Sequence, residues 1–113
     1  MLTIEKLRAF GANVEEGMQR CLNNEAFYLR LVDKAIRDPS FDSLREAAEK
    51  EDLERGFELA HALKGVCANL ALTPLSVPIS EMTELFRNRT KTDYRPFAEA
   101  IIAKRDELIS LSL

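Results

Sequence analysis

One short segment of the sequence holds the residues best suited to chemistry. Residues 60–72 read AHALKGVCANLAL and contain His61, the only histidine of the chain. Lys64 and Gly65 follow three and four residues later, and on a helix this spacing places both one turn away from the histidine. A glycine inside a helix costs roughly 1 kcal/mol relative to alanine. Its position next to the one imidazole therefore needs an explanation.

The apolar spacing predicts a helix over residues 53–72, with Asp52 as its N-cap. The residues expected to form its buried seam are Leu53, Phe57, Ala60, Leu63, Cys67 and Leu70. Gly56 falls on the same inner side, where a missing side chain lets a neighbouring helix approach closely. At about 100° per residue, His61 then lies at the boundary with solvent. Gly65 and Ala68 share its flank, so we expect a strip without large side chains that leaves the ring accessible to a partner.

Most kinds of histidine chemistry lack their other residues in this segment. A general acid–base pair needs a carboxylate that orients the histidine in a pocket, and a triad needs a nucleophile beside it. Cys67 lies about 120° away in the seam, and one histidine with two separated cysteines is too few for a structural zinc site. The remaining possibility is nucleophilic attack by the neutral imidazole on a phosphoryl group. In that reaction a partner protein supplies the metal and the carboxylates. The less favoured alternative is an amphipathic histidine without a function.

The segment resembles the H-x-x-K-G signature of histidine-containing phosphotransfer (HPt) domains, and the similarity extends over AHALKGVCANLALTPL. The resemblance implies that His61 accepts a phosphoryl group from an aspartate of a response-regulator receiver domain, or from a sensor histidine kinase. His61 then passes the group to an aspartate of another receiver. Lys64 would stabilise the phosphoryl charge and Gly65 would give access to the ring. The resemblance also implies that Mg²⁺ is bound by the receiver and that the chain has no cofactor of its own.

Two positions depart from the family pattern. The family usually has a glycine where this chain has Ala71, and we expect the substitution to be tolerated because alanine is the better helix former. Pro78 is unusual inside the next helix, since a proline clashes with the preceding turn. We expect that helix either to be kinked near Ser76 or to begin its regular part at Pro78, with Thr73 as a cap ahead of it.

The elements that hold this segment are expected to be helices throughout. Four substantial amphipathic helices with short connections predict an all-α fold, an antiparallel up-down four-helix bundle preceded by one or two short N-terminal helices. Residues 1–113 are expected to form a single HPt domain. The expected N-caps of the first helices are Thr3, Asn13 and the pair Asn23-Asn24. Gly11 is expected to end the first helix, and Asp38-Pro39 to end or kink the third.

Composition and charge argue against several classes of function. The net charge of −3 argues against a nucleic-acid partner, and Arg87, Arg89, Lys91 and Arg95 are assigned to a solvated loop. No apolar run is long enough to insert into a membrane and no secretory signal is present, so we expect a cytoplasmic monomer. Cys21 and Cys67 are expected to be buried free thiols.

These features favour a phosphorelay intermediate without autonomous enzyme activity, since the chain has no P-loop or kinase signature. One alternative is a helical-bundle adaptor that does not transfer phosphate. Another is the phosphotransfer domain of a larger chemotaxis-type histidine kinase, although Met1 and the lack of a trailing linker favour a free-standing protein. The residues expected to dock the receiver are Ala62, Gly65, Ala68 and Leu72, with Glu54 and Glu58 on the outer side of the helix.

Overall fold

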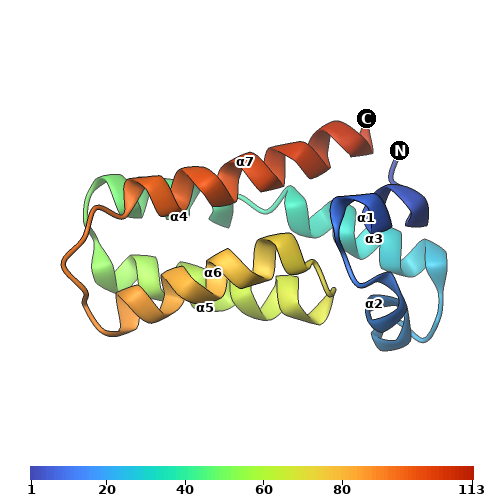
Figure 1. Ribbon diagram of the computed structural model, residues 1–113, viewed down its shortest axis with the longest axis horizontal. Coiled ribbons are helices and arrows are strands. Elements are labelled where there is room, and N and C mark those ends of the chain that lie inside the picture. Colours follow the sequence, from blue (N-terminus) through green and yellow to red (C-terminus); the bar gives the residue numbers. More distant parts are fainter.

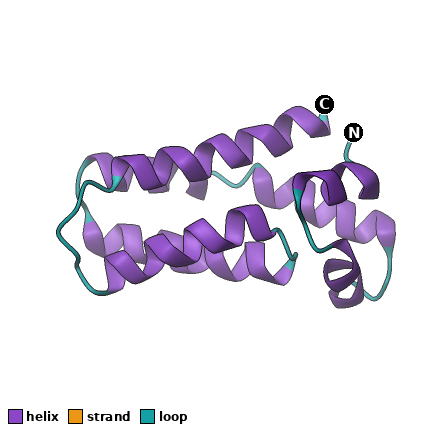
Figure 2. Ribbon diagram, viewed as in Figure 1, coloured by secondary structure: helices purple, strands orange, loops and turns teal.

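The computed structural model describes all 113 residues and contains seven α-helices and no strand (Figure 2). The helices are α1 (Ile4–Phe10), α2 (Val14–Arg20), α3 (Glu25–Ile36), α4 (Ser40–Glu49), α5 (Leu53–Asn69), α6 (Thr73–Arg87) and α7 (Arg95–Ser112). The all-α fold that the apolar spacing predicts is therefore confirmed. None of the seven helices is both long enough and apolar enough to cross a bilayer.

Helices α4 to α7 form the predicted up-down bundle, in which successive helices run in opposite directions (Figure 1). Helix α5 packs between α4 and α6, and α7 closes the ring by packing on the same two helices. The large side chains buried between them include Phe41, Leu44, Ile79, Met82, Phe86 and Ile101. This core fixes α5, which carries the candidate residues, on two sides and leaves its outer surface in solvent.

Helices α1, α2 and α3 cover one end of the bundle, and the two termini lie close together there (Figure 1). The N-terminal ammonium of Met1 donates to the carbonyl of Leu113 at 2.6 Å. The predicted caps are confirmed, because the side chains of Thr3, Asn13 and Asn24 each accept from the backbone N–H three residues later. Cap chemistry involves only neighbouring residues, which is why the sequence located these helix starts.

The junction at Asp38-Pro39 ends a helix rather than kinking it. Helix α3 ends at Ile36 and α4 begins at Ser40, since the residue before a proline is pushed out of the helical region. The carboxylate of Asp38 accepts from the N–H of Ser40 at 2.8 Å. The two helices follow one another along the same side of the molecule (Figure 1).

The N-terminal helices hold the end of α5 through its last carbonyl groups, which have no partner inside the helix. The Tyr28 hydroxyl donates to the carbonyl of Leu70 at 2.8 Å, and burial raises the pKa of Tyr28 to about 12. The N–H of Asn13 donates to the carbonyl of Ala71 at 3.0 Å. Arg20 donates to the carbonyl of Ala68 at 2.5 Å. Residues far from His61 in sequence thus fix the helix on which it lies.

Helix α5 ends at Asn69, three residues earlier than predicted, and this changes the interpretation of Ala71. Ala71 has a φ of 57°, in the left-handed region. The N–H of Leu72 donates to the carbonyl of Cys67, and that of Ala71 to the carbonyl of Ala68, which is the Schellman pattern at a helix end. The expectation that alanine is favoured here as a helix former is wrong, because this position lies outside the helix and favours glycine.

Helix α6 begins at Thr73 and continues through Pro78. The expectation that Thr73 caps this helix is wrong, since Leu72 takes the N-cap position and no side chain bonds there. The alternative that the regular part begins only at Pro78 is also wrong. Pro74 occupies the first turn, where its missing N–H has no helical partner to lose, and buried Leu75 and Ile79 anchor the helix on either side of Pro78.

Candidate functional site

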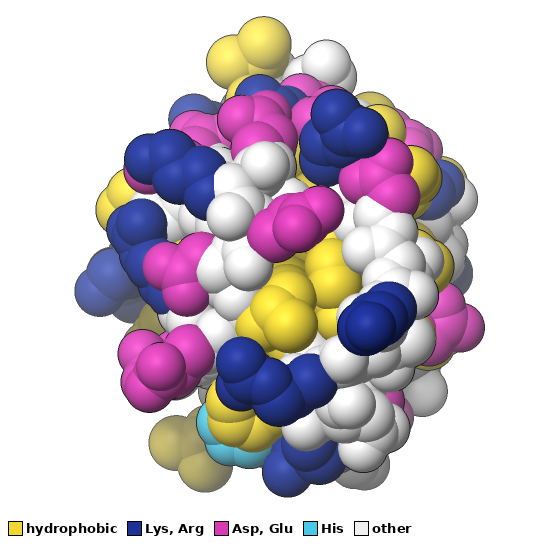
Figure 3. All heavy atoms as spheres, turned by 90° about the vertical axis from the view of Figure 1, so that its left-hand side faces the viewer, with side chains coloured by type: hydrophobic (Ala, Val, Ile, Leu, Met, Phe, Trp, Pro, Cys, Tyr) yellow, Lys and Arg dark blue, Asp and Glu magenta, His cyan; other side chains and the backbone are white.

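His61 lies in the middle of α5 with its side chain exposed to solvent, as its helical angle predicts. No hydrogen bond or ion pair within the molecule engages either nitrogen of its ring. The histidine reaches the surface at the lower edge of Figure 3, next to hydrophobic and basic side chains. Both ring nitrogens are therefore available to a group that approaches from outside.

One face of the imidazole packs on Phe57, one turn earlier on α5. The two ring centroids are 5.5 Å apart and the ring planes differ by 20°. The guanidinium of Arg87, at the end of α6, lies over the same Phe57 ring, 5.0 Å from its centroid. The sequence interpretation gave Phe57 a packing role and assigned Arg87 to a solvated loop. The spacing of four residues between Phe57 and His61 was the signal for this contact, because such residues are neighbours on a helix surface.

Lys64 lies one turn after His61 and its ammonium has no acidic partner. The side chain is half-buried, which fits a stem that lies along the helix and a charged end that reaches solvent. Two other surface lysines are paired: Lys50 contacts Glu46 at 2.9 Å and Lys104 contacts Glu107 at 3.3 Å. The positive charge of Lys64 is thus available to an anion bound near the histidine.

Gly65 leaves open space beside His61. A Cβ added at this position would meet no atom within 4 Å, and Ala62 and Ala68 are exposed around it. These three residues form the exposed strip predicted from the sequence. Leu72 does not belong to it, because its exposed fraction is 0%. The helix was expected to reach residue 72, which would have placed Leu72 on the histidine's flank; the turn after Asn69 points it into the core instead.

Gly56 has the opposite environment on the same helix. A Cβ added there would lie 2.4 Å from Cζ of Phe86, which confirms that Gly56 faces a closely packed neighbour. The glycine lets the Phe86 ring pack directly on the backbone of α5. Because α5 and α6 are held this tightly, the Phe57 ring and Arg87 come together between them.

Neither cysteine offers chemistry beside the histidine. Cys21 and Cys67 are free and buried, as predicted. Burial raises the pKa of the Cys67 thiol to about 12, so this group stays protonated near neutral pH and is a poor nucleophile. No three His, Cys, Asp or Glu side chains are grouped so that they could hold a metal ion.

Two of the four basic residues near the α6–α7 connection, Arg87 and Arg95, form ion pairs with acidic neighbours. Arg87 pairs with Glu84 at 3.2 Å and Arg95 with Asp93 at 2.9 Å. Figure 3 shows basic and acidic side chains intermixed on this end of the molecule. The pattern is that of a solvated surface, as the sequence predicts, except that Arg87 also reaches the Phe57 ring.

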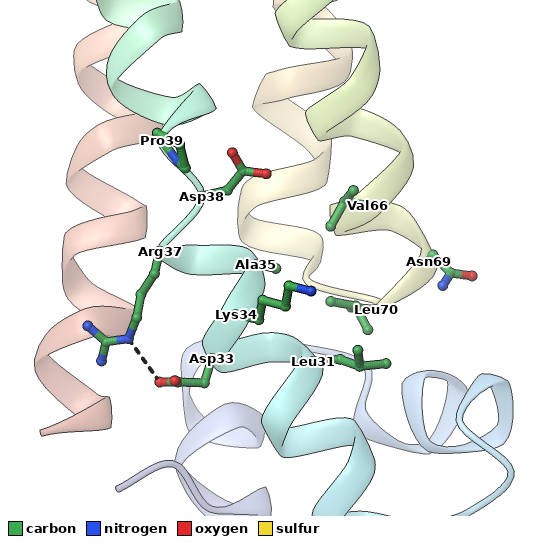
Figure 4. A pocket seen from close by; sticks show the side chains of 10 residues that line it. All are labelled: Leu31, Asp33, Lys34, Ala35, Arg37, Asp38, Pro39, Val66, Asn69 and Leu70. Atoms are coloured by element: carbon green, nitrogen blue, oxygen red, sulfur yellow. Dashed lines mark hydrogen bonds and ion pairs between the residues drawn. The ribbon is translucent and has the colours of Figure 1, made fainter.

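A separate hollow of about 780 Å³ lies on the other flank of α5 (Figure 4). Its residues come from the end of α3, the α3–α4 junction and the last turns of α5, and its apolar ones are Leu31, Ala35, Val66 and Leu70. The ion pair between Arg37 and Asp33, at 3.3 Å, lies at its edge (Figure 4). Val66 follows His61 by five residues and is therefore about 140° around the helix. The hollow is not part of the histidine's flank.

The sequence model of the Hpt domain family matches residues 38–111. The match covers helices α4 to α6 and all but the last residue of α7, and it contains His61, Lys64 and Gly65. Helices α1, α2 and α3 all precede it. No curated protein and no solved structure is significantly similar to the chain.

Proposed function

The chain belongs to the Hpt domain family, the phosphotransfer modules of two-component signalling, and from this premise we propose that His61 is its phosphorylated residue. In this proposal the protein is a phosphorelay intermediate. His61 accepts a phosphoryl group from an aspartate of a response-regulator receiver domain, or from a sensor histidine kinase, and passes it on to a receiver aspartate.

The observation that carries the proposal is the exposed His61 ring without a hydrogen-bond partner, beside an unpaired Lys64 and the open space over Gly65. Phosphoryl transfer depends chiefly on positioning and on stabilisation of charge. His61 supplies an accessible nucleophile at a fixed position, and Lys64 supplies a positive charge one turn away. The docking protein provides the phosphoryl group.

The chemical step is a direct exchange between two nucleophiles. The lone pair of one imidazole nitrogen attacks phosphorus, the new P–N bond forms, and the P–O bond to the aspartate breaks with its electrons staying on the departing carboxylate. The other ring nitrogen keeps its proton, so the phosphorylated ring is transiently cationic. Lys64 stabilises the phosphoryl oxygens as a point charge, and Mg²⁺ bound by the receiver would supply further charge stabilisation.

The docking surface in this proposal is the strip of Ala62, Gly65 and Ala68 around the ring. Small side chains let a second protein bring its reacting aspartate against the imidazole. Contacts between transient signalling partners are small, typically below about 1,200 Å², and this strip suits such a contact. Because the partner brings the metal and the carboxylates, the chain acts as an acceptor and donor and not as an enzyme by itself.

The proposal is tested with a receiver domain labelled on its aspartate by radioactive phosphate. The wild-type protein is expected to take up label that is lost in acid and retained in base, as expected of a phosphoramidate. His61→Gln is expected to take up none while remaining folded, because the exposed ring makes no hydrogen bond in the fold and its stack on Phe57 contributes only about 0.5–1.5 kcal/mol. Equal labelling of the two proteins contradicts the proposal and favours a non-transferring adaptor.

A further inference from the structure

We propose that Phe57 is a positioning residue, which holds the imidazole of His61 by its face so that both ring nitrogens stay open for phosphoryl transfer. This inference rests on the function proposed above. The carrying observation is the stack of the two rings, whose centroids are 5.5 Å apart with planes 20° from parallel. Centroid separations of about 4.5–7 Å are typical of attractive ring pairs.

The stack matters because nothing else within the molecule orients the ring. A reactive histidine is usually oriented by a hydrogen bond to one of its nitrogens, which also fixes where the proton lies. No such bond engages His61. A face contact restricts the tilt of the ring and leaves its edge free, and both nitrogens lie on that edge. One nitrogen can therefore attack phosphorus while the other retains its proton.

Phe57 is itself well fixed. Its side chain is half-buried and packs against the core cluster of the bundle. From α6, the guanidinium of Arg87 lies 5.0 Å from the centre of the Phe57 ring, and the Glu84 carboxylate accepts from Nε of Arg87 at 3.2 Å. The order of contacts is thus Glu84, Arg87, Phe57 and His61. Each member restricts the next, so an exposed ring gains orientation from the α5–α6 packing.

The size of the effect follows from the strength of the contact. Aromatic pairs add about 0.5–1.5 kcal/mol beyond the area that they bury, and each 1.4 kcal/mol is a factor of ten in a rate. Loss of the Phe57 ring should therefore slow phosphorylation of His61 about two- to tenfold. The effect is on the reactivity of the ring and should persist when no partner protein is present.

The test compares Phe57→Leu, Phe57→Tyr and a matched control, Phe97→Leu. Phe97 is also a half-buried phenylalanine packed on the core, but it lies on α7 and has no contact with the histidine. The rate of His61 phosphorylation is measured with phosphoramidate, a small phosphoryl donor that needs no docking surface. The chemical shifts of the His61 ring protons report the stack directly, because a nearby aromatic face moves them upfield.

In the wild type, the His61 ring protons should be shifted upfield, show cross-relaxation with the Phe57 ring and populate one dominant side-chain rotamer. Phe57→Leu should remove the upfield shift and slow the phosphoramidate reaction about two- to tenfold. Phe57→Tyr should restore both quantities, and Phe97→Leu should change neither. Slowing in Phe97→Leu equal to that in Phe57→Leu would show a general loss of stability and overturn the inference.

Two further results keep the inference separate from the proposed function. The inference fails if the His61 ring of the wild type shows no contact with Phe57 and averages over several rotamers. This measurement uses only the wild-type protein, so it holds even if Phe57→Leu does not fold. The inference also fails if Phe57→Leu reacts with phosphoramidate at the wild-type rate. The proposed function fails on another observation, namely that a phosphorylated receiver transfers no label to His61 of the wild-type protein.

Discussion

Gly56 and Gly65 lie on the same helix, α5, yet a Cβ at the first would be 2.4 Å from Cζ of Phe86 while a Cβ at the second would meet nothing within 4 Å. One glycine is required by packing between helices. The other has no structural neighbour that would exclude a side chain. The contrast separates the positions that hold the bundle together from those that keep its surface clear.

The two glycines are expected to respond to alanine with opposite signs. Gly65→Ala should raise the free energy of unfolding by roughly 1 kcal/mol, because alanine is the better helix former and has room. Gly56→Ala should lower it by about 1–3 kcal/mol, because the added methyl group forces the Phe86 ring to move. Urea unfolding measures both. Two changes of the same sign would show that the packing of α5 on α6 is misassigned.

A large side chain at Gly65 should impair docking without harming the fold. Gly65→Leu is expected to be at least as stable as the wild type, since leucine also favours helices. Transfer from a phosphorylated receiver should slow by about tenfold or more, because small displacements of reacting groups have large effects on rate. Phosphoramidate, which needs no docking surface, should react with His61 at nearly the wild-type rate. An unchanged rate of transfer from the receiver would refute the role given to the glycine.

Lys64 is expected to affect the transfer rate and not the stability. Lys64→Gln removes an ammonium that has no acidic partner, so the free energy of unfolding should stay within about 0.5 kcal/mol of the wild type. Transfer from the receiver should slow about tenfold, since a hydrogen bond to a charged group contributes roughly 1.5 kcal/mol or more. The matched control is Lys104→Gln, whose lysine pairs with Glu107 on α7. If both variants transfer alike, Lys64 is merely a surface residue.

Replacement of Ala71 by glycine should not weaken the end of α5. The left-handed φ of Ala71, 57°, costs about 1–2 kcal/mol for a residue with a Cβ, and this is partly offset by burial of its methyl group, worth about 0.8 kcal/mol. Ala71→Gly should therefore be neutral or stabilising by up to about 1 kcal/mol. Ala68→Gly, inside α5, should be destabilising by about 0.5–1 kcal/mol. Thermal unfolding of the pair checks this, and equal losses would place residue 71 inside the helix.

The features predicted correctly from the sequence are those that depend on neighbouring residues. Asp52 accepts from the N–H of Arg55 at 3.2 Å, as a cap requires, and the buried side of α5 follows from its apolar spacing. The exposure of His61 follows from the same angles. A helical period and a capping side chain are local properties, so a single sequence is enough to locate them.

The predictions that failed depend on contacts between distant residues. The end of α5 is set by the turn through Ala71 and by the hydrogen bonds from Tyr28, Asn13 and Arg20 of the N-terminal helices. No pattern in the sequence near the helix end predicts these hydrogen bonds. A helix that continued to residue 72 would bring Leu72 onto the docking strip, whereas the turn buries it.

Phe57 shows a subtler kind of error. The apolar spacing correctly placed it toward the core, and half of its side chain does pack there. The ring also stacks on His61, a contact that the spacing of four residues allows, whereas its contact with Arg87 depends on the position of α6. A residue at the edge of a buried seam can serve both the core and the site, and a pattern that divides residues into inner and outer faces does not reveal this.

The central claim is that the exposed ring of His61 carries the phosphoryl group, and peptide mapping of the phosphorylated protein tests it most directly. The protein is labelled by a phosphorylated receiver, digested at alkaline pH to preserve the P–N bond, and sequenced by mass spectrometry. The phosphoryl group is expected on the peptide that contains His61, at that residue, and should disappear after acid treatment. Label that maps to any other residue, or that survives acid, would contradict the claim.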